Sequence, residues 1–464
     1  MYFLSPEFLI LAFATVLLYY LVPASYRRIV LLVASLIFYA SVKLEYLALI
    51  ITSSLIDYFA ALAMCRYPQN TKRGYFLAVS VVLNLSLLIS FKYWNFFSNS
   101  LGTLSDTNTF VHDWIVPVGL SFYTLQTMGY SIDVYRGKFK AERSYGVFLL
   151  YTAFFPQLVA GPIERASNLM PQLKKLTLPS TTQVQAGILL ILWGLFIKTV
   201  VADNLAPAVQ QAYTGNQASL LLWGFSAAGL IQVYCDFWGY TEIARGIAKL
   251  FNVQLSINFR QPFLAKNLAG FWKRWHITLT RWLMDYVQVP LMRRFPEEPL
   301  RSFVAIFTLV LIGFWHGASW NFILFGLFQG VVLTLWRLCE NIVWLRKIIL
   351  NQWVSRSLLF ITMSLSLPMF YIVDMQQLQQ ILTSMLSFQS FEVAPIDHFS
   401  SLIIALLGFT VVFSYDLLAE YRGFKIEQLA EKSLSTRILV GSLLYGAILV
   451  GGKSGGGEFV YFAF

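Results

Sequence analysis

Residues 303–336 read FVAIFTLVLIGFWHGASWNFILFGLFQGVVLTLW, an apolar run that contains no Asp, Glu, Lys or Arg. A straight helix of this length would measure about 50 Å, whereas the hydrocarbon core of a bilayer is roughly 30 Å thick. The small residues Gly317, Ala318 and Ser319 therefore predict a break between two shorter helices. His316 would then lie where the first helix ends, next to an internal cavity.

The composition of the whole chain also indicates a helical membrane protein. Of its 464 residues, 57% are hydrophobic and 12% are charged, whereas soluble domains carry about 25% charged residues. Further apolar runs lie at about 6–22, 29–42, 46–64, 75–94, 115–133, 146–160, 184–202, 219–238, 355–373, 400–418 and 436–452. Since some runs are short, we predict roughly eleven transmembrane helices plus re-entrant and interfacial helices. The expected fold is an all-α polytopic membrane protein with one membrane domain, residues 1–464.

The net charge of +11 raises the question of a nucleic-acid partner. The basic residues instead lie in short loops after the first, third and fifth apolar runs: Arg27, Arg28, Arg66, Lys72, Arg73, Arg136, Lys138, Lys140 and Arg143. Basic loops mark the cytoplasmic side of a membrane protein. We therefore expect no nucleic acid and an N-terminus that faces outward. Cys65, Cys235 and Cys339 are too widely spaced to predict a metal site or a disulfide framework.

Residues 270–287 have the pattern of an amphipathic helix that lies along the membrane interface. One face gathers Trp272, Trp275, Leu279, Trp282, Leu283 and Tyr286, and the opposite face gathers Arg274, Arg281 and Asp285. Interfacial anchoring would explain the tryptophans and arginines equally well. His276 lies at the edge of the buried face, and we interpret it as functional.

His276 and His316 are two of only four histidines in the chain. An ionisable side chain at membrane depth is costly and is by default a functional candidate. Imidazole also exchanges protons easily near neutral pH. The alternative for His316 is a structural hydrogen bond to a neighbouring helix.

Two segments resemble the signature motifs of the membrane-bound O-acyltransferase (MBOAT) family: GFWHGASW at 313–320 and FWKRWHITL at 271–279. Other segments resemble its bacterial branch: VPVGLSFYT at 116–124, FPQLVAGPIE at 155–164, YCDFWGYT at 234–241 and SINFRQPF at 256–263. This branch includes alginate O-acetyltransferases, peptidoglycan O-acetyltransferases and teichoic-acid D-alanyl transfer proteins. The resemblance runs in order from about residue 115 to 335.

The resemblance implies an O-acyltransferase of the bacterial cytoplasmic membrane, with a cytoplasmic and an extracellular funnel. His316 matches the catalytic histidine of the family, and His276 matches the second histidine of this branch. The implied donor is acyl-CoA, such as acetyl-CoA, or an acyl-carrier-protein thioester, with no tightly bound cofactor and no metal. The implied acceptor is a hydroxyl of an exported cell-envelope polysaccharide such as alginate, reached directly or through a periplasmic acyltransferase partner of the SGNH type.

Several residues near the motifs are candidates for donor or substrate binding. Lys273 and Arg274 would attract the phosphates of the donor, although orientation in the membrane explains basic residues equally well. The remaining candidates are Trp275, Trp315, Tyr234, Asp236 and Asn258.

Two alternatives to acetyl transfer stay open, besides an inactive scaffold for an envelope complex, which the intact histidine motifs disfavour. One is D-alanyl transfer to teichoic acid from a carrier protein. The other belongs to a different class, a proton-coupled transporter or lipid flippase in which the histidines relay protons. Transporters often contain inverted repeats, and we find no such internal symmetry in the sequence.

Overall fold

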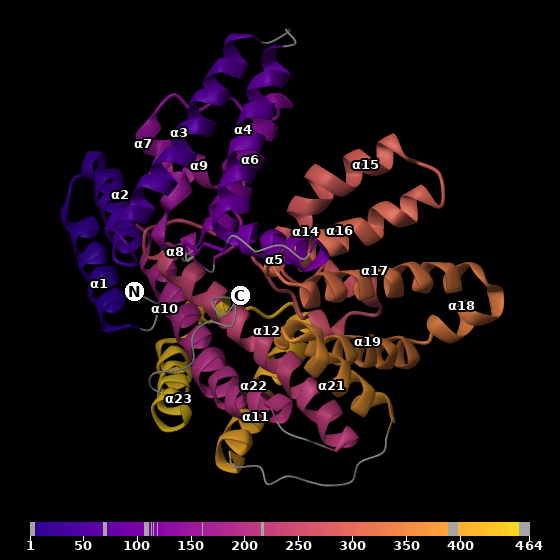
Figure 1. Cartoon of the computed structure of the whole chain (residues 1–464). Helices are drawn as coiled ribbons and strands as arrows, with labels where there is room; N and C mark the ends of the chain where they lie inside the picture. The colour runs from indigo at the N-terminus through magenta and orange to yellow at the C-terminus, as the bar shows by residue number, and fades with distance from the viewer. Residues whose placement is uncertain are drawn as a thin grey trace. The chain divides into compact units, whose positions relative to one another are not determined.

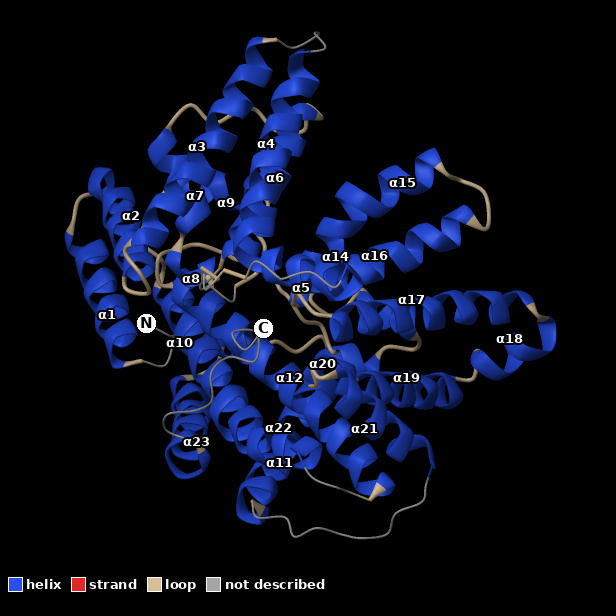
Figure 2. Ribbon diagram, viewed as in Figure 1, coloured by secondary structure: helices blue, strands red, loops and turns tan. Residues whose placement is uncertain are grey.

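The computed structural model describes residues 5–67, 72–105, 111–112, 114, 116–117, 119–159, 161–214, 218–387 and 398–453. Within these ranges every regular element is helical (Figure 2), which confirms the predicted all-α class. The chain divides into two compact units, Met1–Ile191 with Thr241–Ser256 and Leu192–Tyr240 with Ile257–Phe464. Both boundaries fall inside helices, in α10 (Thr181–Leu195) and α12 (Ser219–Lys249). A single membrane domain therefore stays a prediction.

The first unit is built from helices of the N-terminal half. They are α1 (Pro6–Leu21), α2 (Ala24–Ala40), α3 (Glu45–Arg66), α4 (Lys72–Leu88), α5 (Trp94–Ser105), α6 (Leu120–Tyr135), α7 (Tyr145–Ala153), α8 (Phe155–Leu158) and α9 (Ala166–Lys174), with a π-helical turn η1 (Ile89–Tyr93). Asp57 of α3 is fully buried and accepts hydrogen bonds from Ser80 and Asn84 of α4 and from Ser131 of α6. Such satisfied polar contacts hold apolar helices in register.

The second unit contains both histidine motifs. Its elements are η2 (Phe196–Ala202), α11 (Asp203–Thr214), η3 (Pro262–Leu264), α13 (Leu268–Trp272), α14 (Ile277–Leu283), η4 (Met284–Gln288), α15 (Val289–Arg294), α16 (Leu300–His316), α17 (Trp320–Asn341), α18 (Val343–Ile349), α19 (Gln352–Ser366), α20 (Pro368–Tyr371), α21 (Met375–Ser387), α22 (Phe399–Arg422), η5 (Ile426–Glu431) and α23 (Leu434–Gly451). Residues 219–240 of α12 also belong to this unit.

Helices α16 and α17 form a tight hairpin (Figure 1). A Cβ added to Gly313 would lie 2.1 Å from the carbonyl oxygen of Phe322, and one added to Gly326 would lie 2.4 Å from the carbonyl oxygen of Leu309. Small residues let two membrane helices approach this closely. The predicted break at residues 317–319 is confirmed, because α16 ends at His316 and α17 begins at Trp320.

Eight helical segments in the described part of the chain are long and apolar enough to cross a membrane. They are Glu45–Arg66, Lys72–Gly102, Thr181–Thr214, Ser219–Lys249, Trp320–Asn341, Gln352–Tyr371, Phe399–Arg422 and Leu434–Gly451. Two further apolar helices, Pro6–Leu21 and Leu300–His316, are shorter. The polytopic helical class is therefore confirmed, whereas the count of eleven crossings is not.

The amphipathic segment 270–287 differs from its predicted form. It is not one helix, because α13 ends at Trp272, the chain turns, and a second helical stretch begins at Ile277, in which α14 continues directly into η4. The predicted sidedness nevertheless holds, since Trp272, Trp275 and Trp282 are buried while Arg281 is exposed. The aromatic face is thus buried on both sides of the turn, while Lys273 within the turn is exposed.

Candidate active site

His316 ends α16 at the point where the chain becomes extended. Gly317 has φ −159° and ψ 151°, and a Cβ on this residue would lie 2.2 Å from the ring of Phe322. Because glycine has no side chain, the ring of Phe322 can pack directly against this position. The His316 side chain is only 4% exposed. The sequence therefore places this imidazole at a helix end inside the second unit.

His276 lies in a left-handed turn directly before α14, with φ 41° and ψ 55°. This conformation is uncommon for a residue with a Cβ and is often found at functional sites. Asn258 supports the turn from a non-helical segment between α12 and η3: its main-chain oxygen accepts from Ile277 N at 2.9 Å. Its Oδ1 accepts from Thr278 N at 3.2 Å and from Thr278 Oγ1 at 2.8 Å. Asn258 thus fixes the two residues that follow His276.

The two histidines, far apart in the sequence, lie close together in the structure. Their ring centroids are 6.5 Å apart, with the planes inclined at 51°. Trp315 contacts both rings edge-on, at 5.7 Å from His276 and 5.2 Å from His316. Burial lowers the pKa of His276 from its ordinary 6.5 to about 3. His276 is therefore a neutral imidazole at physiological pH.

A small cavity of about 30 Å³ adjoins His316. Its walls are mainly aromatic and aliphatic side chains, among them Trp272, Trp275, Phe325, Leu367 and Phe370. Phe370, from α20, meets the His316 ring edge-on at 5.2 Å. The predicted internal cavity at His316 is therefore present, and its lining is nearly free of polar groups.

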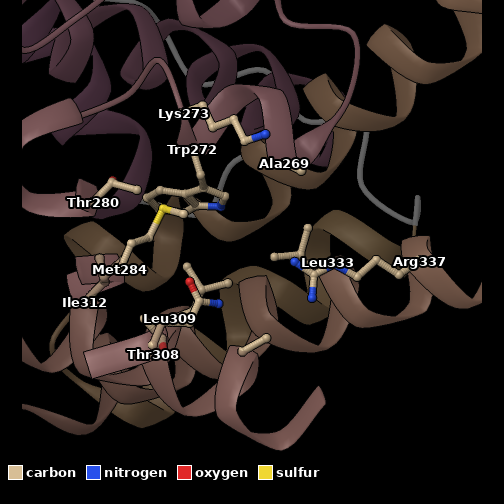
Figure 3. A pocket seen from close by; sticks show the side chains of 12 residues that line it. Ala269, Trp272, Lys273, Thr280, Met284, Thr308, Leu309, Ile312, Leu333 and Arg337 are labelled. Carbon is tan, nitrogen blue, oxygen red and sulfur yellow. The ribbon is translucent and has the colours of Figure 1, made fainter. Parts of the chain in front are cut away.

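A second, partly open pocket of about 90 Å³ also has Trp272 in its lining (Figure 3). Lys273 and Arg337 border it, and none of its twelve lining residues is acidic. The indole nitrogen of Trp272 is buried, points into this pocket and finds no hydrogen-bond partner among the described residues. We call this space the basic pocket, because its rim carries two cations.

Of the remaining predicted site residues, some lie at or near the cavity, and others are engaged by side chains elsewhere in the second unit. Trp275 lines the cavity. The ring centroid of Tyr234 lies 6.2 Å from that of Trp275. Tyr234 donates a hydrogen bond to Asp416 of α22 at 3.1 Å. Arg274 is already engaged, because it forms a two-pronged ion pair with Glu420 at 2.8 and 3.0 Å. Of the two basic candidates, only Lys273 borders the basic pocket.

Asp236 belongs to a separate buried cluster. Its carboxylate lies 2.6 Å from Lys198 Nζ, and Asp203 lies 2.5 Å from the same nitrogen. All three side chains are at most about 3% exposed. This cluster joins α12 to η2 and α11, so Asp236 has a structural contact that explains its burial.

Several residues of the site were missed from the sequence. Phe325 and Phe370 line the cavity, and Arg337 borders the basic pocket. Asp416 accepts the hydrogen bond of Tyr234, and Glu420 pairs with Arg274. The two carboxylates had a readable signal, since they interrupt an otherwise apolar run. The two phenylalanines had no such signal, because the sequence around them is rich in other aromatic residues. In the ranges that the structure describes, no cluster of His, Cys, Asp or Glu could hold a metal ion.

The chain is similar to proteins of a known family. The model of the MBOAT family, membrane-bound O-acyltransferase, matches residues 143–373. This range contains both histidines, the cavity and the basic pocket.

Individual relatives extend the match over more of the chain. A peptidoglycan O-acetyltransferase of Helicobacter pylori is 33% identical over 340 residues, which cover 67% of this chain and 64% of that protein. A probable alginate O-acetylase of Pseudomonas putida is 33% identical, with 69% of this chain and 67% of that protein covered. A teichoic acid D-alanyltransferase of Bacillus subtilis is 26% identical, with coverages of 66% and 79%. The chain thus spans just under two thirds of the Helicobacter pylori relative.

Proposed function

Because the chain belongs to the membrane-bound O-acyltransferase family, we propose that it transfers an acyl group from a thioester donor to a hydroxyl group of a cell-envelope polysaccharide. The observation that carries this proposal is the position of His316. Its ring is buried, lies 6.5 Å from a second imidazole and borders a cavity. The named activities of the relatives, O-acetylation of peptidoglycan and alginate, support acetyl as the acyl group.

His316 acts as the general base in this proposal. Its imidazole accepts the hydroxyl proton while the hydroxyl oxygen attacks the thioester carbonyl carbon. The carbon–sulfur bond then breaks, and the leaving thiolate recovers the proton from His316. Base assistance of this kind contributes about 10²–10⁴-fold in rate, and the apolar walls limit hydrolysis of the thioester by water.

His276 has a different role, since it is neutral and sits against Trp315. A neutral imidazole donates a hydrogen bond from one ring nitrogen. We assign that bond to the carbonyl oxygen, on which negative charge develops during attack.

The basic pocket receives the donor in this proposal. Lys273 and Arg337 attract its phosphate groups, and the unpartnered indole N–H of Trp272 faces the same space. Both acyl-CoA and an acyl-carrier protein present a phosphopantetheine thioester, so the pocket fits either source. Arg274 and Asp236 have no part in donor binding in this proposal, because other side chains hold them.

The membrane fold, the relatives and the basic loops of the sequence support the proposed setting. The chain lies in the bacterial cytoplasmic membrane as one domain, with its N-terminus outward and funnels that lead to His316 from the two sides. A periplasmic partner of the SGNH type completes transfer where the acceptor is a distant polymer. D-alanyl transfer to teichoic acid is the second candidate, since one relative carries that name.

The test is release of thiol from acetyl-CoA by the purified protein, with acetyl transfer to alginate oligosaccharides or peptidoglycan fragments as a second measurement. We expect His316→Ala to lose at least 10²-fold of the activity. His398→Ala is the matched control, because His398 is exposed at the start of α22. Equal turnover by His316→Ala would refute the base. Movement of solute across liposomes without thiol release would favour a transporter.

A further inference from the structure

Helix α18 connects two apolar helices of the second unit, α17 and α19. We infer that this short helix is a docking surface for anionic phospholipids at the cytoplasmic face of the membrane. Its cations bind the phosphate groups of the lipids, and its exposed apolar side chains insert between the lipids. This inference goes beyond the acyl transfer proposed above and does not depend on it.

The position of α18 places it at the edge of the bilayer. Helix α17 ends at Asn341, and α19 begins at Gln352. Both helices belong to apolar segments that are long enough to cross a membrane. Figure 1 shows α18 beyond the ends of both helices. The link between two such segments lies at the level of the lipid headgroups, outside the hydrocarbon core.

The side chains of α18 divide between two halves of the helix. At about 100° per residue, Arg346 and Lys347 gather on one half, and the other half carries only apolar side chains: Trp344, Leu345, Ile348 and Ile349. Two of these apolar side chains are not covered by the protein, since Trp344 is 64% exposed and Ile348 is 48% exposed. Arg346 and Lys347 are exposed as well. An exposed apolar face opposite cations is typical of a helix that lies along a membrane interface.

The charges around α18 favour an anionic partner. Between Glu340 and Asp374 the chain contains three basic residues, Arg346, Lys347 and Arg356, and no acidic residue. Asp374 follows the far end of the second apolar segment. Basic residues mark the cytoplasmic side, so α18 faces the leaflet whose surface is negatively charged. Each cation near such a surface increases the affinity about fivefold.

The start of α19 extends this surface. Trp353 is 69% exposed there, and the guanidinium carbon of Arg356 lies 5.9 Å from the centroid of its ring. Tryptophan is enriched at membrane–water interfaces, because its ring is apolar and its N–H is polar. The same pairing of an exposed indole with a cation therefore occurs on α18, in Trp344 with Lys347, and in the first turn of α19.

The first experiment measures the depth of α18 in the membrane. The full-length protein, labelled with fluorotryptophan, is placed in nanodiscs of phosphatidylcholine and phosphatidylglycerol, and the fluorine resonance of Trp344 is assigned by its loss in Trp344→Phe. We expect a lipid with a nitroxide close to its headgroup to broaden this resonance more than a water-soluble gadolinium chelate does. The opposite order would overturn the inference, because α18 would then face water and fit a protein partner.

The second experiment measures which lipid the surface prefers. Short-chain phosphatidylglycerol or phosphatidylcholine is added to the labelled protein in detergent, and the shift of the Trp344 resonance gives a Kd for each lipid. For the wild type we expect phosphatidylglycerol to bind about 30-fold more tightly, because two cations face it. In the double variant Arg346→Gln/Lys347→Gln the two Kd values should become nearly equal.

The double variant Arg422→Gln/Lys432→Gln is the matched control. It removes one arginine and one lysine from another link between apolar helices, that of α22 and α23. Both side chains are exposed, but Glu427 and Glu431 lie between them in the sequence. This variant should keep the wild-type preference for phosphatidylglycerol.

The preference for anionic lipid has two results that would overturn it. One is an equal Kd for the two lipids in the wild type, and the other is an unchanged ratio of Kd values in Arg346→Gln/Lys347→Gln. An equal loss of preference in the matched control would also overturn the inference, because the net charge of the whole protein would then select the lipid. None of these results bears on the proposed acyl transfer, since the variants change no residue of the candidate active site.

Discussion

Arg274 and Glu420 form a two-pronged ion pair, with guanidinium nitrogens 2.8 and 3.0 Å from the two carboxylate oxygens. Arg274 lies two residues before His276, whereas Glu420 lies 146 residues further along the chain, on α22. One turn earlier on the same helix, Asp416 accepts the hydrogen bond of Tyr234. Helix α22 therefore holds both the loop of His276 and the segment of α12 beside it.

The ion pair predicts a positioning role for Glu420. We expect Glu420→Gln to lower kcat for thiol release about 10–100-fold, because a loosened His276 loop misplaces the imidazole. KM for the acyl donor should change less than about twofold in the same variant. Glu431→Gln is the control, since Glu431 is exposed at the end of η5. A rise in donor KM in both Glu420→Gln and Arg274→Gln would show instead that Arg274 binds the donor.

Asn258 should contribute mainly to stability. In Asn258→Ala, the N–H and hydroxyl of Thr278 lose the acceptor that now lies 3.2 and 2.8 Å away. Each intramolecular hydrogen bond contributes about 0.5–1.5 kcal/mol to stability. We expect a lower thermal unfolding midpoint in detergent, compared with Asn341→Ala at the exposed end of α17. Equal midpoints would show that the turn does not depend on Asn258.

His276 should make stability depend on pH. Its pKa is lowered to about 3 by burial, while the unfolded chain has the ordinary value near 6.5. Between these pH values the unfolded state binds the additional proton, so stability falls as pH falls, by about 1.4 kcal/mol per pH unit. His276→Asn removes this titration and tolerates the left-handed turn. Its unfolding midpoint should decline less than that of the wild type between pH 6.5 and 4.5. The same decline in His276→Asn and the control His398→Asn would contradict the prediction.

Much of the fold could be predicted because apolar runs and small residues act locally. The break at residues 317–319 followed from the length of one apolar run and three small residues. The position of His316 at a helix end followed from the same pattern. The count of crossings did not follow, since composition alone does not separate a full span from a shorter apolar helix such as α16.

The site was predicted less completely because its contacts join distant segments. The 3.6-residue period of residues 270–287 fits a continuous helix and carries no sign of a positive φ at His276. The turn depends on Asn258, which lies on a separate non-helical segment. The pairing of Arg274 with Glu420 likewise depends on a helix 146 residues away. The motifs alone therefore identified both histidines but not the residues that hold them.

The buried cluster around Lys198 predicts a double-variant effect. Lys198→Met leaves the carboxylates of Asp203 and Asp236 without the ammonium that lies 2.5 and 2.6 Å from them. Breaking a buried pair in this way costs about 3–5 kcal/mol. We expect a large loss of folded protein in detergent, measured by size-exclusion chromatography. Adding Asp236→Asn should restore part of the folded fraction, because it removes one unpaired charge. No recovery in the double variant would show that Lys198 acts through contacts other than Asp236.

The α16–α17 hairpin predicts a contrast between two glycines. In Gly313→Ala the new Cβ would lie 2.1 Å from the Phe322 carbonyl oxygen, so the helices must separate. Overpacking of this kind costs about 1–3 kcal/mol, and it would also displace His316, one turn further along α16. We expect a lower unfolding midpoint together with lower kcat. Gly446→Ala on α23 is the matched control, because a Cβ there meets nothing within 4 Å. Since alanine favours helix more than glycine does, this control should be neutral or slightly stabilising, and equal midpoints for the two variants would refute the close approach of α16 and α17.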